Sequence, residues 1–559
     1  MKKITALILT VVMVISMMTF VQFGAAAAEG TAITTADQFA AMDVDGKYYL
    51  ANDITVSTTY PVTFTGTIDG NGKTITTSVP LFADFSGTLK NLTINGDIAL
   101  SGTSNSAISQ QTTGTMLVDN VVINANLTGG TAVGAVVGTG KNGANITITN
   151  VTMNGNITDG ANQVGSMVGY CEGTTLTIDS CVNNGTIGVS DPTSDAFKNN
   201  YGGGIVGRFG NDNATTDHVC KITNCVNNGN FTGVKDQCAG IIGYNVGILE
   251  IDGCVNRGDV TNIKRYAGGI FGSAPSKVVG ITITNSYNYG TITGIRRAGG
   301  IAACLGTGAA TTSYQIRNCG NFGSVVCTTD TSNDLNVAGI AAYMYGGSTD
   351  NGVIDCFNVG DITAKDPNAS TKIVYAAGII GYFNTSTAYV KNCFNAGKIT
   401  ADPAANLQVN QVYYNKNADG ASPDYVSNNY ALAVEGASYE VNGIQAASVT
   451  TATADEFASG AVAYALNNAA GKTIYYQTIG TDAAPTNQST AKEVIKTAAG
   501  FGNEGAAAAT TTAPATTTAP VTTTAPTTTP STGDAVWVYV AAAIIALAST
   551  AFIARKREN

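Results

Sequence analysis

The chain has 559 residues, of which only 12% are charged, and its formal net charge is −10. Its 65 glycines and its many small and β-branched residues favour short strands and tight turns over a helical bundle or a disordered chain. The acidic balance argues against nucleic acid as a partner, and the single histidine, His218, excludes a zinc peptidase that needs two.

The N-terminus is typical of an exported protein. Two lysines precede an apolar run over 4–23, and four alanines at 25–28 precede polar sequence. This order of charged, apolar and small residues predicts a cleaved signal peptide over 1–28. A retained membrane helix is the alternative.

Residues 29–118 are predicted to form an N-terminal cap and the first coils of the fold. A short helix is expected over 35–42 with Thr35 as its N-cap, followed by a strand over 47–56. The Asp-Gly-Asn-Gly sequence at 69–72 has some features of a calcium loop. It lacks the alternating carboxylates and distal glutamate of an EF-hand, so a glycine turn is predicted there.

A pattern of the form [Cys/Ser]-x-Asn-x-Gly-x-apolar recurs seven times. The first residues of the seven copies, the anchors, are Cys181, Cys225, Cys254, Ser286, Cys319, Cys356 and Cys393. Each unit holds three apolar stretches: one before the anchor, one at the last motif position and one flanked by glycines. Three short strands per unit predict an all-β, right-handed parallel β-helix with three strands per coil over 119–423.

The constant motif positions have physical explanations. The asparagine amide is both donor and acceptor, so stacked asparagines are expected to bond along the column. Asparagine and glycine also suit the left-handed backbone of a sharp turn. The eleven cysteines of an exported chain could form disulfides between coils. Ser286 replaces one anchor without other change, which favours a buried column of free thiols.

The periodicity fades after residue 400. Residues 453–467 predict a helix with an acidic first turn, and 474–480 predict a strand. Exposed strand edges at the end of a β-helix promote aggregation unless they are covered. Residues 424–505 are therefore predicted to be a C-terminal cap region, so that small helical caps close the fold at both ends.

The last part of the chain predicts a surface anchor. Residues 506–530 contain almost only Ala, Thr and Pro, which predicts an extended linker. Residues 535–554 are apolar and are followed by three basic residues, as in a transmembrane helix with a cytoplasmic end. A plain membrane anchor is one interpretation of this order.

The segment 529–559 resembles the sorting signal of Gram-positive proteins that sortase anchors. Pro530, Thr532 and Gly533 match the Leu-Pro-x-Thr-Gly motif of that family, and Thr529 stands where the family has Leu. The resemblance implies cleavage between Thr532 and Gly533 and attachment of Thr532 to cell-wall peptidoglycan. Sortase and peptidoglycan would then be partners, and the chain would contact the membrane only before sorting.

The glycine-flanked strand followed by Cys-x-Asn-x-Gly is similar to the GLUG-type repeat of bacterial surface proteins. The resemblance covers about residues 30–485, and such repeats occur in adhesin-like proteins and beside immunoglobulin A metallopeptidases. It implies an extracellular, cell-wall-anchored adhesin or binding protein with a glycan or matrix ligand. No catalytic residue, metal or cofactor is predicted.

One candidate binding site arises when the units are aligned on the glycine-flanked strand. Basic residues and a tyrosine then fall into adjacent columns, as a candidate patch for an anion or glycan. The patch consists of Lys235, Lys264, Arg265, Tyr266, Arg296 and Arg297. Solvated turn residues are the alternative interpretation. Tyrosines that follow the glycine strands could stack on sugars or cap the strand ends; they are Tyr170, Tyr244, Tyr343 and Tyr382.

A polysaccharide lyase or glycoside hydrolase on the same scaffold is the alternative function. A hydrolase needs paired carboxylates, and Asp179, Asp252 and Asp355 lie near anchors without forming a cluster in the sequence. His218 lies in a polar insertion, and the chain has no nucleophile elbow for a serine hydrolase. The sequence therefore favours a binding protein over an enzyme.

Overall fold

The computed structural model describes residues 29–503, apart from 142, 192–198, 212–217, 235, 276–279, 307–312, 330–332, 346–350, 368–371, 385–388, 402–406, 416–424 and 434–448. The predicted signal peptide, the 506–530 linker, the sorting motif and the 535–554 span lie outside the described residues. Among the helices that the structure describes, none is long and apolar enough to cross a bilayer.

The N-terminal elements largely follow the sequence. The chain begins with β1 (Thr31–Ile33) and α2 (Ala36–Ala40), and the Thr35 side chain accepts a hydrogen bond from the Gln38 amide, as predicted for an N-cap. The strand expected over 47–56 is interrupted and forms β2 (Lys47–Leu50) and β3 (Ile54–Val56).

The segment at 69–72 is a glycine turn. The Asn71 amide donates to the Asp69 carboxylate at 2.8 Å, and Asn71 and Gly72 have φ of 50° and 70°. The Asp69 carboxylate also lies 3.3 Å from the Lys90 ammonium. The side chain that a calcium loop would present as a ligand is thus used to hold the turn.

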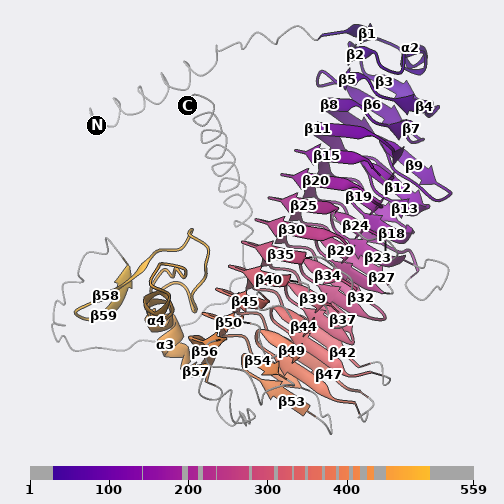
Figure 1. Cartoon of the computed structure of the whole chain (residues 1–559). Coiled ribbons are helices and arrows are strands. Elements are labelled where there is room, and N and C mark those ends of the chain that lie inside the picture. The colour runs from indigo at the N-terminus through magenta and orange to yellow at the C-terminus, as the bar shows by residue number, and fades with distance from the viewer. Residues whose placement is uncertain are drawn as a thin grey trace, which may run out of the picture. The chain divides into compact units, whose positions relative to one another are not determined.

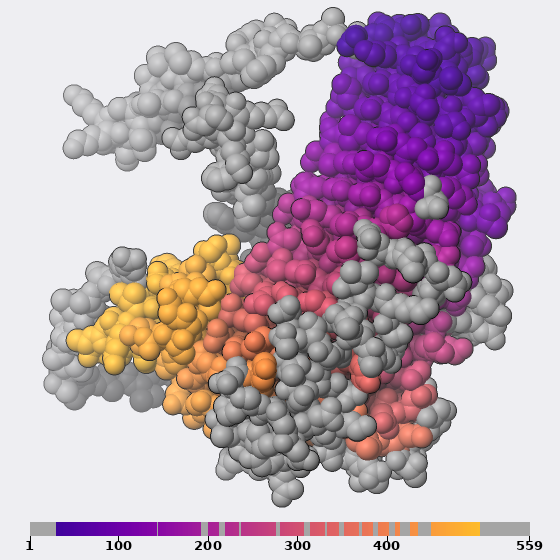
Figure 2. Space-filling view, in the orientation of Figure 1, coloured from indigo at the N-terminus to yellow at the C-terminus, as the bar shows by residue number. Residues whose placement is uncertain are grey.

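The predicted parallel β-helix is confirmed. Like strands of successive coils lie side by side and parallel (Figure 1), and the coils follow one another in chain order along one continuous surface (Figure 2). One full coil consists of β20 (Thr175–Asp179), β21 (Val182–Asn183), β22 (Ile187–Gly188), β23 (Asn199–Gly203) and β24 (Val206–Phe209). These strands belong to four sheets, because β20 and β21 share sheet A, whereas β22, β23 and β24 lie in sheets C, D and B.

Sheet A extends from β1 to β57 (Val449–Ala452), and sheet C from β9 (Asp97–Leu100) to β52 (Ile399–Ala401). The other strands of sheet D are β13 (Thr131–Val133), β18 (Ala161–Gly165), β28 (Gln237–Ala239), β33 (Tyr266–Gly268), β38 (Arg297–Gly299), β43 (Leu335–Ala338), β48 (Val374–Ala377) and β53 (Leu407–Asn410). The other strands of sheet B are β4 (Tyr60–Phe64), β7 (Phe82–Phe85), β10 (Ser109–Thr112), β14 (Val137–Gly140), β19 (Val168–Cys171), β29 (Ile242–Asn245), β34 (Phe271–Ser273), β39 (Ala302–Leu305), β44 (Ala341–Tyr345), β49 (Ile380–Asn384) and β54 (Tyr413–Asn415).

The coil differs from the prediction in the glycine-flanked stretch, which is two strands and not one. The chain bends at Gly204, between β23 in sheet D and β24 in sheet B. A Cβ at Gly204 would lie 2.0 Å from the carbonyl oxygen of Gly240 in the next coil and 2.5 Å from the Asn227 side chain. Only glycine fits at this bend, because the neighbouring backbone lies so close.

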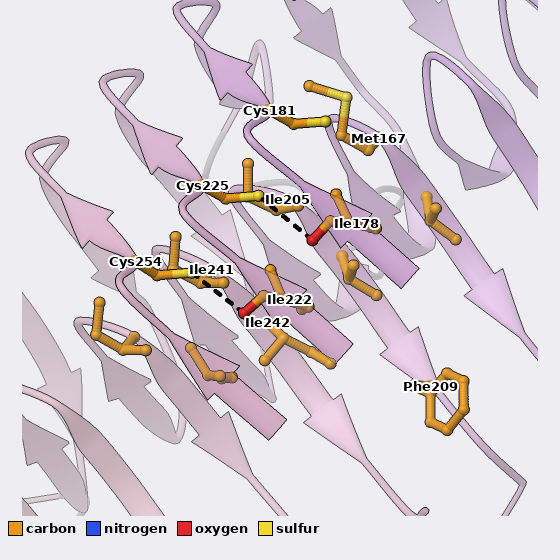
Figure 3. Close-up of a cluster of buried hydrophobic side chains, with 14 of the residues drawn as sticks. Met167, Ile178, Cys181, Ile205, Phe209, Ile222, Cys225, Ile241, Ile242 and Cys254 are labelled. Carbon is orange, nitrogen blue, oxygen red and sulfur yellow. Dashed lines mark hydrogen bonds between the residues drawn. The ribbon is translucent and has the colours of Figure 1, made fainter. Parts of the chain in front are cut away.

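The core is a set of columns of inward side chains. Ile178 pairs with Ile222 in the parallel register between β20 and β25 (Val219–Thr223), and both are fully buried. Figure 3 shows these isoleucines beside the column of anchors Cys181, Cys225 and Cys254. All eleven cysteines are buried free thiols, so the favoured interpretation is confirmed over disulfides.

The anchor position needs a small hydrogen-bond donor. The Cys225 thiol donates to the carbonyl of Thr223 at 3.2 Å, across Asn224, which has a left-handed φ of 53°. The Ser286 hydroxyl donates the equivalent bond to the carbonyl of Thr284 at 2.7 Å. Serine replaces cysteine because both side chains make this bond.

The motif asparagines form a buried ladder, as predicted. The Asn227 amide donates to the Asn256 side-chain oxygen at 2.8 Å and to the carbonyl of Gly229 at 2.9 Å. The same two bonds repeat for each motif asparagine from 183 to 358. The expectation of a left-handed turn at the motif Asn and Gly is wrong, because the left-handed residue precedes the anchor. The motif glycine is required by close approach: a Cβ at Gly258 would lie 1.9 Å from the Gly229 oxygen.

The C-terminal segment forms a small module. The helix expected over 453–467 is broken at Gly460 (φ 89°) into α3 (Ala454–Ala458) and α4 (Ala461–Ala470). The strand expected over 474–480 is absent from the structure, and Tyr476 makes only isolated bridges. A hairpin of β58 (Val494–Thr497) and β59 (Gly500–Asn503) ends the described chain.

The module packs on the outer face of sheet A. Phe357 and Phe394, the outward residues after two anchors, contact a cluster that includes Phe457 and Tyr475. The Tyr475 hydroxyl donates to the carbonyl of Asn392 at 2.6 Å. The same outward position in earlier coils holds Val182, Val226 and Val255. Valine thus gives way to phenylalanine at the two positions that contact the module.

Candidate functional site

Two columns of outward side chains face each other where sheets D and B meet, and we call the surface between them the crease. The sheet D column contains Tyr201, Gln237, Tyr266, Arg297, Asn336 and Tyr375 in register. The sheet B column contains Tyr170, Arg208, Tyr244, Ser273, Cys304, Tyr343 and Tyr382. Ring centroids 4.6 Å apart for Tyr201 and Tyr244, and 4.8 Å apart for Tyr375 and Tyr382, show that the columns touch.

An arginine surrounded by tyrosines lies towards the N-terminal end of the crease. The Arg208 guanidinium lies 4.8 Å from the ring centroid of Tyr201, 5.3 Å from that of Tyr244 and 5.5 Å from that of Tyr170. Its Nε donates to the carbonyl of Gly210 at 3.0 Å. These cation–π contacts hold a positive charge against an aromatic surface on an otherwise acidic protein.

A second arginine cluster lies three coils further on. The Arg297 guanidinium lies 3.7 Å from the ring centroid of Tyr343 and 4.8 Å from that of Tyr266, and thus between the two rings. Its Nη1 lies 2.7 Å from the Cys304 sulfur, and its Nε donates to the Asn336 side-chain oxygen at 3.3 Å. Since arginine stays protonated in proteins, this cluster carries a fixed positive charge.

Two tyrosines of the crease, Tyr170 and Tyr343, remain neutral at ordinary pH. Burial raises the pKa of Tyr170 to about 12, although the nearby Arg208 opposes the rise. Burial likewise raises the pKa of Tyr343 to about 12, against the effect of Arg297. These two phenol groups therefore keep their protons, and the positive charges of the crease come from its guanidinium groups.

A pocket of about 230 Å³ opens at the C-terminal end of the crease. Its walls come from β38, β43, β44, β48 and β49 and from the residues just before β38 and β43. The lining residues are Arg296, Arg297, Asn333, Asp334, Asn336, Tyr343, Tyr375 and Tyr382. The rings of Tyr343 and Tyr382 are parallel, with centroids 5.1 Å apart, so they form one ordered wall.

The structure brings together only part of the basic patch that the sequence indicated. Tyr266, Arg296 and Arg297 meet at the crease, where the Arg296 guanidinium lies 5.6 Å from the Tyr266 ring centroid. Arg265 instead forms an ion pair with Asp236 at 3.0 Å. Lys264 is exposed, and Lys235 lies outside the described residues.

The sequence contained a signal for the rest of the site. The four tyrosines proposed for sugar contact and the basic columns lie on opposite sides of the glycine bend. Treated as one strand, the glycine-flanked stretch gives no reason to place these two sets together. The bend at Gly300 places Arg297 of β38 against Tyr343 of the following coil. Asn336 and Tyr375 also belong to the site, although no sequence pattern indicated them.

The aspartates near the anchors have structural roles. The Asp179 carboxylate accepts hydrogen bonds from Thr223 and Asn224 of the next coil, the latter at 2.9 Å. Burial alone would raise the pKa of Asp179, but these bonds and one from Ser180 hold it below its ordinary value. Asp252 is bonded in the same way to Thr284 and Asn285. These carboxylates fix neighbouring coils to one another, and the pKa of Asp179 is lowered, whereas a general acid needs a raised pKa.

No cluster of three or more His, Cys, Asp or Glu side chains suited to a metal occurs in the described part of the chain. No protein-family model and no curated protein matches the sequence. One solved structure matches, and it is described as a "putative immunoglobulin A1 protease" from Bacteroides ovatus. The two sequences are 15% identical, and the match covers 50% of this chain and 78% of that chain with a TM-score of 0.31. A likeness at that level establishes neither a family nor an activity.

Proposed function

We propose that the protein is anchored in a Gram-positive cell wall and binds extracellular glycans through the crease. The pocket at the end of the crease is the observation that carries the binding proposal. It combines guanidinium, amide and phenol groups with an ordered aromatic wall, a set that matches the hydroxyl groups and rings of sugars. The rigid stack of coils keeps these groups in fixed positions along one line.

The proposal of a surface location is supported by the ends of the sequence. An N-terminal export signal, a Thr/Pro linker, the Pro-x-Thr-Gly sequence at 530–533 and an apolar segment with a basic end occur in the order that sorting requires. The GLUG-type repeat gives the same indication. A linker of this composition would hold the β-helix away from the wall.

A glycan array tests the binding proposal. The probe is the protein without residues 1–28 and without the segment after Thr532, and we expect it to bind a subset of extracellular polysaccharides. Arg296→Gly should weaken this binding, whereas Arg317→Gln should retain it, because Arg317 lies in sheet A, bonded to Gln315. Absence of binding to every glycan would contradict the proposal.

The same samples test the alternative of an enzyme. Release of reducing ends or of unsaturated sugars from a bound polysaccharide would show a hydrolase or lyase and overturn the proposal of a pure binding protein. If the protein only binds, a polysaccharide incubated with it for a long time should have the same chain length as the polysaccharide incubated in buffer.

Cell fractionation tests the anchoring proposal. We expect the wild-type protein to be released from cells by muralytic enzymes and to stay attached in detergent. Thr532→Ala with Gly533→Ala should move it to the membrane or the medium, because sortase would have no bond to cut. A wild-type protein found only in the membrane fraction would favour the plain membrane anchor.

A further inference from the structure

The pocket at the end of the crease is rich in hydrogen-bond donors. Two guanidinium groups, two amides and three phenols line it together with the carboxylate of Asp334. That carboxylate already accepts a bond from the Ile373 amide at 3.1 Å, which ties it to the adjacent coil. The charges of the lining therefore sum to about +1, on a protein whose net charge is −10. Such a lining complements a group that offers acceptors and a negative charge.

Arg296 is held in a conformation that its residue type disfavours. Its φ is +74°, in the left-handed region that glycine and asparagine tolerate better. The backbone is fixed there by neighbouring coils, since the Arg296 amide donates to the Thr328 carbonyl at 3.1 Å and the Arg296 carbonyl accepts from the Asn336 amide at 2.7 Å. An arginine at such a position, with its side chain on the pocket, indicates a functional requirement for the guanidinium.

Arg297 is preorganised for the same purpose. Its guanidinium lies on the Tyr343 ring, its Nε is engaged with Asn336, and its Nη1 lies beside the Cys304 sulfur. A planar guanidinium held in place in this way matches the planar oxygens of a carboxylate better than it matches a scattered set of hydroxyls. The pocket volume of about 230 Å³ is several times that of a water molecule and is large enough for one sugar ring.

We infer that this pocket binds one carboxylate-bearing sugar residue, of the sialic acid or uronic acid type. Arg296 and Arg297 contact the carboxylate, while Asn333, Asn336 and the phenols bind the ring hydroxyls. This inference rests on the proposed function, since it names the class of glycan that the crease selects. Sialic and uronic acids share the relevant chemistry, and separate probes distinguish them.

Calorimetric titration of the intact protein with two matched pairs of probes tests the inference. The pairs are 3′-sialyllactose with lactose, and tetragalacturonate with galactotetraose. We expect the acidic member of at least one pair to bind about tenfold more tightly than the neutral member, with a preference that weakens in high salt. Inorganic sulfate should compete only weakly, because it lacks the sugar ring.

Variants separate loss of the guanidinium from loss of the fold. Arg296→Gly should lower affinity for the acidic probe about tenfold and leave the melting temperature unchanged or higher, because glycine relieves the left-handed backbone. Arg317→Gln is the control with the same loss of charge and should bind as the wild type does.

The outcomes distinguish the inference from the proposed function. Equal binding of acidic and neutral probes would overturn the inference and leave glycan binding intact. Sulfate that binds as tightly as the acidic sugar, or an acid preference that survives in Arg296→Gly, would also overturn it. Absence of binding to any sugar probe and to every glycan on the array would overturn both.

Discussion

Each motif glycine contacts the backbone of the preceding coil, so its missing side chain is a steric requirement. For Gly258 the Cβ of any other residue would lie 1.9 Å from the carbonyl oxygen of Gly229. Gly280 is a useful contrast, because a Cβ there would meet only the Ser313 oxygen, at 3.9 Å. Two glycines of neighbouring coils therefore differ in what they tolerate.

The substitution Gly258→Ala should lower the free energy of unfolding by about 3 kcal/mol, because the coils must separate to admit the methyl group. Gly280→Ala should change it by less than about 1 kcal/mol, since the methyl group has space and the unfolded chain loses freedom. Urea unfolding followed by far-UV circular dichroism measures both. Equal effects of the two substitutions would contradict the close-approach explanation.

The column of asparagines is the element that ties one coil to the next inside the fold. From Asn183 to Asn358, each amide bonds both the next asparagine and a glycine carbonyl of its own turn. The first asparagine of the ladder, Asn183, has an unpaired buried side-chain oxygen, because Met153 precedes it in register and cannot donate. An outer ladder of exposed asparagines, which includes Asn184 and Asn228, runs beside the buried one.

The substitution Asn256→Leu should lower the free energy of unfolding by about 4 kcal/mol. The substitution removes a hydrogen-bond partner from three buried groups: the Asn227 amide, the Asn288 side-chain oxygen and the Gly258 carbonyl. Each buried polar group that loses its partner costs about 1–3 kcal/mol of stability. Asn228→Leu, the same change on the exposed ladder, should cost less than about 0.5 kcal/mol. A chemical denaturation series with both variants checks this, and a small effect at residue 256 would show that the buried ladder is not needed.

The elements show how far the sequence could predict the fold. The recurrence of Cys-x-Asn-x-Gly was enough for the parallel β-helix, the inner columns and the asparagine ladder, because each depends on identical residues at identical places in successive coils. The bend at Gly204 was missed, since a glycine required by close approach looks in sequence like any turn glycine. The break at Gly460 was missed because a glycine inside a helical pattern does not reveal its backbone conformation, which here is left-handed with a φ of 89°.

The candidate site was predictable only in part. Arg296, Arg297 and the tyrosines could be found, because each occupies a repeated column. Their meeting across the bend depends on the angle between two sheets, which no local pattern encodes. The ion pair of Arg265 with Asp236 likewise depends on which side of a turn each side chain takes.

At the scale of the whole molecule, the buried thiols and phenols make stability depend on alkaline pH. Burial raises the pKa of Cys171 and of Cys238 to about 12, whereas an unfolded thiol titrates near about 8.5. A group whose pKa is raised by folding contributes stability that is complete below its unfolded pKa. That stability is lost as the pH rises towards the folded pKa.

The free energy of unfolding should therefore fall steadily between about pH 8.5 and pH 12, by about 1.4 kcal/mol per pH unit for each such thiol. Tyr170 and Tyr343 add to the loss above about pH 10. Urea unfolding at a series of pH values measures this. A free energy of unfolding that stays constant up to pH 11 would contradict the presence of free, buried thiols.

The described part of the molecule is best understood as a scaffold of uniform coils that carries a specialised surface, the crease. The inner columns repeat, whereas the crease changes from coil to coil and ends in a polar pocket. The module after residue 452 covers part of sheet A, and the crease lies on sheets D and B. The constant residues thus build the support, and the variable outward residues supply recognition.

A crystal structure of the protein soaked with tetragalacturonate or 3′-sialyllactose tests this account most directly. We predict electron density for one sugar ring in the pocket beside Tyr343 and Tyr382, with its carboxylate on Arg296 and Arg297. A sugar bound to the exposed asparagine ladder or to the C-terminal module, with the pocket empty, would contradict it.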